Sequence, residues 1–222
     1  MKKKIFNLNK EKPVFNLSKE NPNILDILYC GCGWKTKGYS SVDVDLSVIA
    51  VDSMNKKVET CSFNNKNRLI ANCMYHFGDD LTGNDHKTDI DNEQIQLDLG
   101  NAPLNISAFY IMAGVYSGSL KDIESMYGCI RNSDQVKEVN ANMTNMSDKG
   151  IILAKVYRDD NDWKIERIDK PINTGKVYEA APYINGTLQY GQSLSGQRIT
   201  SEDRMSTESS GGFFGAVANL FS

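Results

Sequence analysis

Apolar and polar residues alternate at every second position in many short stretches of this chain. The clearest is SVDVDLSVIAV (41–51), in which valine and leucine alternate with aspartate and serine. A period of two predicts a β-strand with one buried face. Short strands separated by Gly, Asn, Asp and Pro predict an all-β fold, either a sandwich or a barrel. The other stretches that look extended are 24–34, 57–63, 93–99, 107–116, 150–158 and 162–168.

Two segments allow more local predictions. The residues RDDND (158–162) join the last two predicted strands, so we expect a β-hairpin there, with a loop longer than the tightest turns. The segment SLKDIESMYGCI (119–130) is predicted to form a short helix. Helices should otherwise be few and short, because the strands account for most of the chain.

The strand 41–51 carries two carboxylates, Asp43 and Asp45, on the same side. Aspartate is disfavoured in strands, and residues two apart on a strand are only about 7 Å from one another. Like charges at this spacing repel each other. The pair therefore needs either open solvent or a compensating positive charge.

A second acidic stretch, GDDLTGNDHKTDIDNE (78–93), lies between two predicted strands. Lys87 is its only lysine or arginine, so most of its acids lack a local partner. The stretch is also long for a sandwich, in which hairpin loops usually span about two to five residues. Acidic loops are usually just solvated, but these oxygen atoms also suit a cation. The acids are Asp79, Asp80, Asp85, Asp89, Asp91 and Glu93.

A hard cation would explain both acidic stretches together. Ca²⁺ takes about six to eight oxygen ligands, and its charge offsets the repulsion between carboxylates. The nearby histidines are His76 and His86 and no cysteine adjoins the loop, so the residue types favour Ca²⁺ over zinc or copper. Mg²⁺ is the alternative ion, and a solvated acidic face is the alternative to any site. We expect His76 to pack within the sheet and not to bind metal.

The composition describes one globular domain with a tail: 222 residues, 40% hydrophobic, 24% charged, with a net charge of −3. This charge is too balanced to suggest nucleic acid as a partner. No segment reaches the roughly 18 apolar residues of a membrane-spanning helix, and polar residues interrupt any secretory signal. The five cysteines are expected to be buried, reduced thiols of a cytoplasmic protein and not zinc ligands.

The character of the sequence changes at Ser193, after which it is polar and rich in serine and glycine. We therefore predict a domain over residues 1–192 and a flexible linker over 193–222. The linker ends in the apolar stub FFGAVANLFS (213–222). Because an exposed apolar segment is unusual, the stub should either dock on the domain or tether the chain to a protein partner or a second copy.

Several motifs resemble the TerD family of tellurium-resistance and stress proteins. The most specific is the family's GDNRTGEGEGDDE followed by a strand, which is similar to residues 78–93 followed by QIQLDL (94–99). The likeness runs from about Ile5 to Lys170. The remaining pairs, with the family motif first, are DFDLDASV with SVDVDLSV (41–48), FYNN with SFNNK (62–66), GELYRHNGEWKF with AKVYRDDNDWKI (154–165), and VGLGWD with CGCGWK (30–35).

This resemblance implies a two-sheet β-sandwich with a few short helices, which binds Ca²⁺ through acidic loops at one end and has no known catalytic activity. Two positions depart from the family pattern, because Ser41 and Val115 stand where acids are typical. The departures imply fewer or weaker ions than the two usual in the family. The metal ligands that the resemblance implies are Asp43, Asp45, Asp79, Asp89, Asp91 and Glu93.

We therefore predict a non-enzymatic Ca²⁺-binding protein that acts in stress or tellurium resistance through Ca²⁺-dependent structure or partner binding. The first alternative is a structural or assembly module, encoded by a phage or associated with a virion, that uses the same sandwich. The second is a metal-dependent hydrolase, in which Asp43, Asp45 and Asp79 bind an ion that activates water. No base held by a second group accompanies these acids, which favours the non-enzymatic prediction.

Overall fold

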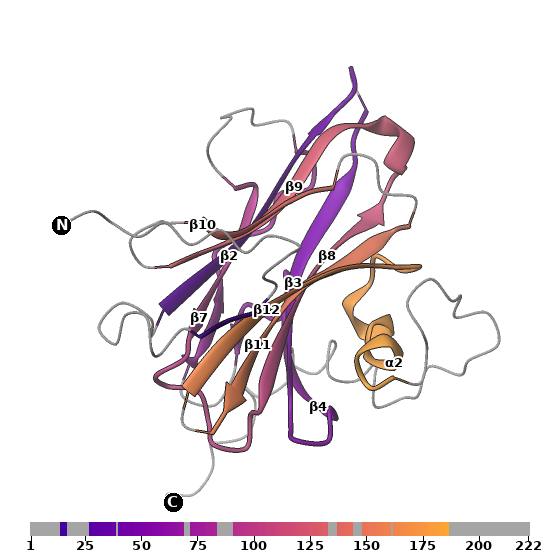
Figure 1. The fold of residues 1–222 in the computed structure, drawn as a ribbon. Helices are drawn as coiled ribbons and strands as arrows, with labels where there is room; N and C mark the ends of the chain where they lie inside the picture. The colour runs from indigo at the N-terminus through magenta and orange to yellow at the C-terminus, as the bar shows by residue number, and fades with distance from the viewer. Residues whose placement is uncertain are drawn as a thin grey trace, which may run out of the picture.

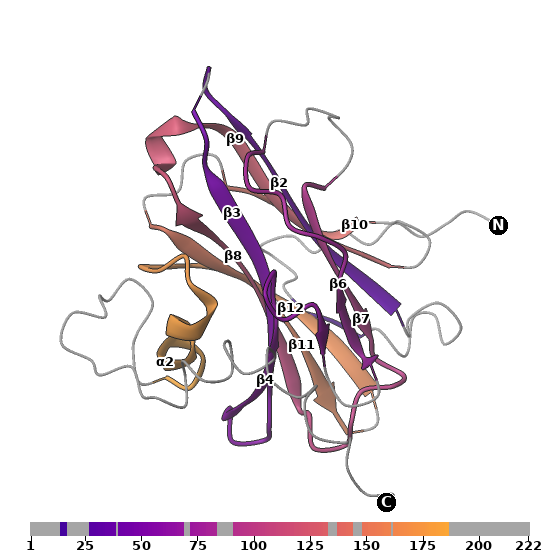
Figure 2. The ribbon, with the colours of Figure 1, turned by 180° about the vertical axis from the view of Figure 1, so that it is seen from behind.

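The computed structural model describes residues 14–16, 27–38, 40–68, 72–83, 91–132, 137–143, 148–160 and 162–186. Within them the chain folds as two six-stranded sheets that pack face to face, with only short helices (Figures 1 and 2). Neighbouring strands are antiparallel throughout both sheets. The predicted all-β sandwich is confirmed.

The strands follow two spatial orders, one in each sheet. The first sheet runs β1 (Val14–Asn16), β12 (Asp162–Ile172), β11 (Gly150–Asp159), β8 (Ala108–Ser117), β3 (Asp43–Val51), β4 (Lys57–Cys61). The second runs β10 (Lys137–Asn142), β9 (Ile123–Asn132), β2 (Ile27–Thr36), β7 (Glu93–Asp98), β6 (Met74–His76), β5 (Asn67–Arg68). The helices are η2 (Leu120–Asp122), η3 (Val177–Glu179) and α2 (Ala181–Ile184).

The main hydrophobic core lies between the two sheets and is built by the alternation of each strand. On β3 the residues Val44, Leu46 and Val48 are fully buried in it. On β2 the core residues include Cys30 and Cys32, and all five cysteines of the chain are buried and free of disulfides, as the sequence predicts. Burial of such side chains is the main favourable contribution to the free energy of folding.

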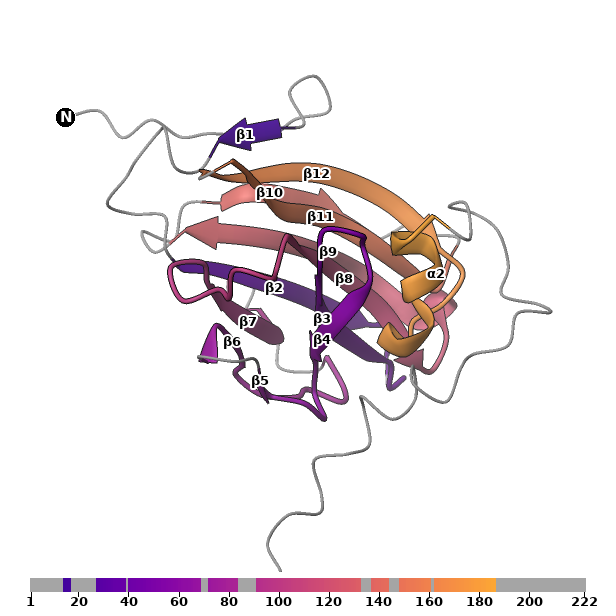
Figure 3. The same cartoon turned by 90° about the horizontal axis from the view of Figure 1, so that it is seen from below.

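A second, smaller core covers the outer face of the first sheet, where α2 and its flanking residues pack on β3 and β8 (Figure 3). Ile49 and Val51 of β3 and Met112 of β8 form one cluster there with Tyr183 and Ile184. Both faces of β3 are therefore buried along its second half. Nearer the start of β3, the face that carries Ile49 and Val51 holds Asp43 and Asp45 in place of apolar residues.

The hairpin predicted over 150–168 is confirmed, but its strands extend further than the sequence suggests. The two strands pair as far as Asp159 of β11 and Asp162 of β12, so the connection is shorter than the predicted loop. Asp160 takes the left-handed backbone conformation, with φ at 56°. Short aspartate side chains tolerate this conformation better than most, which explains why the loop can be so tight.

The short helix predicted over 119–130 is wrong. Only Leu120–Asp122 form a single 3₁₀ turn, and the segment from Ile123 onward is strand β9. β9 pairs with β2 on one side and β10 on the other. This pairing satisfies its backbone groups on both edges, and such tertiary context readily overrides the weak local helix preference.

The boundary predicted between the domain and the linker at residues 192 and 193 lies outside the described residues, as does the stub over 213–222. Among the residues that are described, no helix is long and apolar enough to cross a membrane.

Phe109 of β8 is fully buried, and its ring centroid lies 5.6 Å from that of Trp163. We expect Phe109→Ala to lower the free energy of unfolding by about 3–5 kcal/mol, because it removes buried contacts and leaves a cavity. Leu104→Ala is the matched control, since Leu104 is 92% exposed and its truncation should cost less than about 0.5 kcal/mol. Urea unfolding of the two variants tests this, and equal losses would contradict the core assignment.

Candidate metal centre

Three carboxylates from two separate segments meet at one end of the sandwich. Asp43 and Asp45 come from the start of β3, and Asp79 comes from the loop that follows β6. One carboxylate oxygen from each lies within 4.8 Å of the others. In the part of the chain that the structure describes, no other three histidine, cysteine, aspartate or glutamate residues come together in this way.

Strand β3 can meet the loop because its first half has a free edge. β4 pairs with β3 only from Val48 to Val51, so the described residues leave the Leu46 N–H without a strand partner on that side. Glu93, at the start of β7 in the other sheet, supplies the partner. Its Oε2 accepts from Leu46 N at 2.6 Å, and its Oε1 accepts from Asp80 N at 3.4 Å. Glu93 therefore joins the β3 edge to the residue that follows Asp79.

The carboxylates of Asp43 and Asp45 are buried and incompletely hydrogen-bonded, whereas Asp79 is exposed. Asp43 is 9% exposed and Asp45 is 5% exposed. Asp43 Oδ1 and Asp45 Oδ1 are both inaccessible to solvent and make no hydrogen bond. Gly114 lies opposite Asp45 on β8, and its missing side chain lets Gly175 pass directly over the strand. Buried acceptors without partners are costly, and a cation would satisfy them.

The electrostatic environment shifts these acids strongly toward their protonated forms. Burial, followed by the charges of Glu93, Asp43 and Asp79, raises the pKa of Asp45 to about 8. Burial and the nearby charges of Asp79 and Asp80 also raise the pKa of Asp43. Burial raises the pKa of Glu93 to about 9, although its bond from the Leu46 N–H acts in the opposite direction. Such mutually repelling groups are typical of a site that holds a cation.

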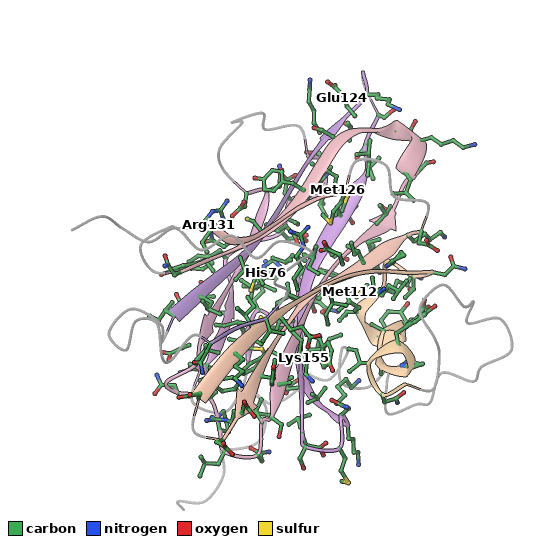
Figure 4. The ribbon with its side chains drawn as sticks, in the orientation of Figure 1. His76, Met112, Glu124, Met126, Arg131 and Lys155 are labelled. Carbon is green, nitrogen blue, oxygen red and sulfur yellow. The ribbon has the colours of Figure 1, made fainter. Side chains whose placement is uncertain are left out.

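His76 lies beside Glu93 and does not join the carboxylate cluster. It is 1% exposed, and Figure 4 shows it in the interior. Burial, with a contribution from Lys66, lowers the pKa of His76 to about 4, so the ring is neutral. Its Nδ1 accepts from Gly78 N, which assigns the ring proton to Nε2, 3.5 Å from Glu93 Oε2. The expectation that His76 packs within the sheet agrees with this position.

The segment after Asp79 is held in a compact turn by Asp80, which the sequence analysis named among the acids of this stretch but not among the predicted ligands. Asp80 Oδ1 accepts from the backbone N–H groups of Thr82 and Gly83, at 2.9 and 3.0 Å. Asp80 Oδ2 accepts from the Asn92 side-chain amide at 2.8 Å. The order Asp, x, Thr, Gly is a recognisable signal for such an aspartate-capped turn. Asn92 carried no comparable signal, because its role depends on a distant residue.

The structure separates the remaining predicted ligands. Glu93 lies beside the cluster, where it bonds to the backbone on both sides. The Asp91 carboxylate lies apart from it and forms an ion pair with Arg131, on the outer side of the second sheet. Asp89 lies outside the described residues. Ser41, which replaces a typical family acid, donates its hydroxyl to Leu81 O at 3.4 Å.

The donor set fits a hard cation. Asp43, Asp45 and Asp79 offer only carboxylate oxygens, and their negative charges lack a basic partner within the cluster. Oxygen-only donors suit Ca²⁺ or Mg²⁺, whereas zinc and copper prefer nitrogen and sulfur. The unbonded Oδ1 atoms of Asp43 and Asp45 give this fit its strongest support.

Comparison with known proteins identifies the family of this chain. The family model for the TerD domain matches residues 5–180. This chain belongs to the TerD family. The resemblance predicted from the motifs is therefore confirmed, and the low identities below are those of a divergent member.

Three relatives show the range of the family. The chain is 27% identical over 154 residues to "Tellurium resistance protein TerZ" of Serratia marcescens, covering 63% of this chain and 77% of the relative. It is 28% identical over 121 residues to "Chemical-damaging agent resistance protein B" of Clostridium acetobutylicum, covering 51% of this chain and 85% of the relative. It is 27% identical over 158 residues to "Stress response protein SCP2" of Bacillus subtilis (strain 168), covering 63% of this chain and 73% of the relative.

Solved structures support the fold. A homologue of the telluride resistance protein TerD from Streptomyces coelicolor A3(2) superposes with a TM-score of 0.62 at 9% identity, covering 72% of this chain and 97% of the other. A protein of unknown function superposes with the same TM-score at 11% identity, covering 72% and 96%. At these identities the likeness concerns the fold alone.

The raised pKa values predict how the stability of the metal-free protein depends on pH. Between the ordinary carboxylate range and about pH 8, the unfolded chain has ionised Asp45 while the native state still binds its proton. The native state then holds more protons than the unfolded state, so the free energy of unfolding falls as the pH rises. Urea unfolding in EDTA between about pH 5 and pH 8 measures this slope.

Asp45→Asn removes one titrating group from the centre, so its stability should depend less steeply on pH than that of the wild type. Glu124→Gln, at a half-exposed position outside the centre, should keep the wild-type slope. Equal slopes in wild type and Asp45→Asn would show that Asp45 does not hold its proton in the native state.

Proposed function

We propose that this TerD-family chain is a non-enzymatic Ca²⁺-binding protein. Asp43, Asp45 and Asp79 would hold the ion between β3 and the loop after β6. The bound ion would join the two sheets at this end of the sandwich, and the resulting order would be recognised by a partner. The observation that carries this proposal is the convergence of three carboxylates, two of them with buried oxygens that make no hydrogen bond.

A bound cation would reverse the balance of charges at the centre. Without one, each carboxylate raises the energy of the others, and burial removes the water that would screen them. Ca²⁺ would interact favourably with all three at once, and would favour their ionised forms over the protonated ones. Since the ion binds a site that only the folded chain assembles, binding would also add to stability.

Ca²⁺ fits the centre better than Mg²⁺. Mg²⁺ demands near-ideal octahedral geometry and gives up its water reluctantly, whereas Ca²⁺ accepts irregular sets of carboxylates, carbonyls and waters. Asp43 and Asp45 come from a twisted strand and Asp79 from a loop, an irregular arrangement of this kind. Waters and backbone carbonyls would complete the coordination.

The positions of the neighbouring groups support a binding role over a hydrolytic one. A metal-dependent hydrolase needs a base within reach of the ion, oriented by a second group. The histidine nearest the cluster in the described residues, His76, accepts from Gly78 N and faces Glu93. Glu93 in turn accepts from Leu46 N and Asp80 N. The His76 ring and the Glu93 carboxylate thus accept hydrogen bonds from backbone N–H groups around the centre.

The setting we propose is a cytoplasmic response to stress or to tellurium compounds. The names of the relatives, which speak of tellurium resistance, chemical-damaging agents and stress response, support this setting. The five buried thiols without disulfides suit a reducing compartment. We propose that a protein partner or a second copy, engaged through residues 193–222, recognises the Ca²⁺-bound state. An assembly module built on the same sandwich is the alternative.

Thermal melting in EDTA, Ca²⁺ or Mg²⁺ tests the proposal. Ca²⁺ at 100 times its dissociation constant should stabilise the native state by about 2.7 kcal/mol and raise the melting temperature, with a smaller effect of Mg²⁺. Asp45→Asn and Asp79→Asn should each remove most of the Ca²⁺ effect, because each deletes one ligand charge. Glu124→Gln removes a charge outside the centre and should leave the effect intact. A wild-type melting temperature that ignores Ca²⁺ would refute the site.

A further inference from the structure

A buried ion pair on the outer side of the second sheet joins Asp91 to Arg131, which is labelled in Figure 4. The guanidinium of Arg131, on β9, binds both carboxylate oxygens of Asp91, with Nη2 2.8 Å from Oδ1. The Tyr127 hydroxyl donates to Asp91 Oδ1 at 3.0 Å. The side chains of Arg131 and Asp91 are only 8% and 3% exposed. This two-point geometry leaves neither partner free to turn.

Strand β2 is shaped to receive this pair. A side chain at Gly31 would place its Cβ 2.1 Å from Asp91 Oδ2, and one at Gly33 would place it 2.4 Å from the Tyr127 ring. The intervening residue, Cys32, points the other way into the core. The alternation in CGCG (30–33) thus keeps bare backbone on the outside, where Asp91 and Tyr127 lie against it.

Three consecutive residues link the ion pair to the metal centre. Asp91 is held by Arg131 on the outer side of the sheet. Asn92 accepts from Trp34 N at 3.0 Å and donates to Asp80 Oδ2 at 2.8 Å. The Glu93 carboxylate accepts from Leu46 N and Asp80 N on the inner side of the sheet. Residues 91–93 therefore hold Asp80 from two directions, and Asp80 is adjacent to the ligand Asp79.

We propose that the Asp91–Arg131 pair is a positioning element for the metal centre. It would fix residues 91–93 against β2 and β9, so that Asn92 and Glu93 hold the turn carrying Asp79 in reach of β3. The inference rests on the proposed Ca²⁺ function only where its test measures Ca²⁺ affinity. Outer partners of this kind set metal affinity by orienting the groups that touch the ion.

A buried ion pair is a poor source of net stability, because the cost of removing both charges from water offsets their attraction. A role in fixing the register of a segment explains the pair better. The same contact explains why Asp91, an acid in the family's metal motif, does not join Asp43, Asp45 and Asp79. Its charge is already balanced by a fixed cation of the protein itself.

The test compares Arg131→Met with wild type in two measurements. Calorimetric titration gives the Ca²⁺ dissociation constant, which should rise about tenfold in the variant. Amide hydrogen exchange of metal-free protein reports the Thr82 and Gly83 N–H groups, which donate to Asp80 Oδ1. Their exchange should accelerate in the variant, because the Asp80 carboxylate loses its support. Arg131→Lys keeps the charge without the two-point contact and should give intermediate values in both.

Two controls separate positioning from general loss of stability. Lys35→Met breaks the exposed Lys35–Glu124 ion pair, which also joins β2 to β9. Ile130→Val, next to Arg131 in the chain, weakens the buried core. Neither variant should change the Ca²⁺ dissociation constant or the exchange of the Thr82 and Gly83 amides.

The possible outcomes are distinguishable. If Arg131→Met binds Ca²⁺ like wild type and its Thr82 and Gly83 amides exchange at the wild-type rate, the positioning role is refuted while the Ca²⁺ function stands. If wild type does not bind Ca²⁺, the proposed function fails, and amide exchange alone decides the positioning role. If Arg131→Met does not fold, Gly31→Ala replaces it, since its Cβ would displace Asp91 and should accelerate the same two amides.

Discussion

The candidate metal centre depends on one buried hydrogen bond between the two sheets, from the Leu46 N–H to Glu93 Oε2. β4 covers only the second half of β3, so in the described residues the Leu46 N–H faces the interior without a strand partner. An unpaired buried donor is costly, and the carboxylate of Glu93 supplies its acceptor. With its other oxygen Glu93 accepts from Asp80 N, and this places Asp79 beside Asp43 and Asp45.

This arrangement concentrates negative charge where water is excluded. Asp45 and Glu93 both have pKa values raised far above their ordinary range, chiefly by burial. The core on one face of β3 and the segment over Gly114 on the other prevent the carboxylates from turning to solvent. The buried Asp43 and Asp45, beside the exposed Asp79, stabilise the fold only if a positive charge joins them, so the proposed Ca²⁺ binding and the stability of the fold are linked.

The sequence predicted much of this, and its failures have identifiable causes. Alternation predicted the strands because one face of each strand packs in the core, and it placed Asp43 and Asp45 on one side of β3. It failed over 123–130, where pairing on both edges of β9 overrode a weak local preference. The family resemblance grouped Asp91 with the other predicted ligands, whereas Arg131, 40 residues later, decides where Asp91 points.

Short-range periodicity and motif order were enough to predict the fold class, the family and the two acidic segments of the candidate metal centre. Which acids meet depends on contacts that form only when the chain folds. Asp43, Asp45 and Asp79 converge, while Asp91 pairs with Arg131 on the opposite side of the second sheet. The physical reason is that a buried carboxylate is stable only beside a hydrogen-bond donor or a positive charge. For these residues the donors and charges lie in strands that only folding brings together.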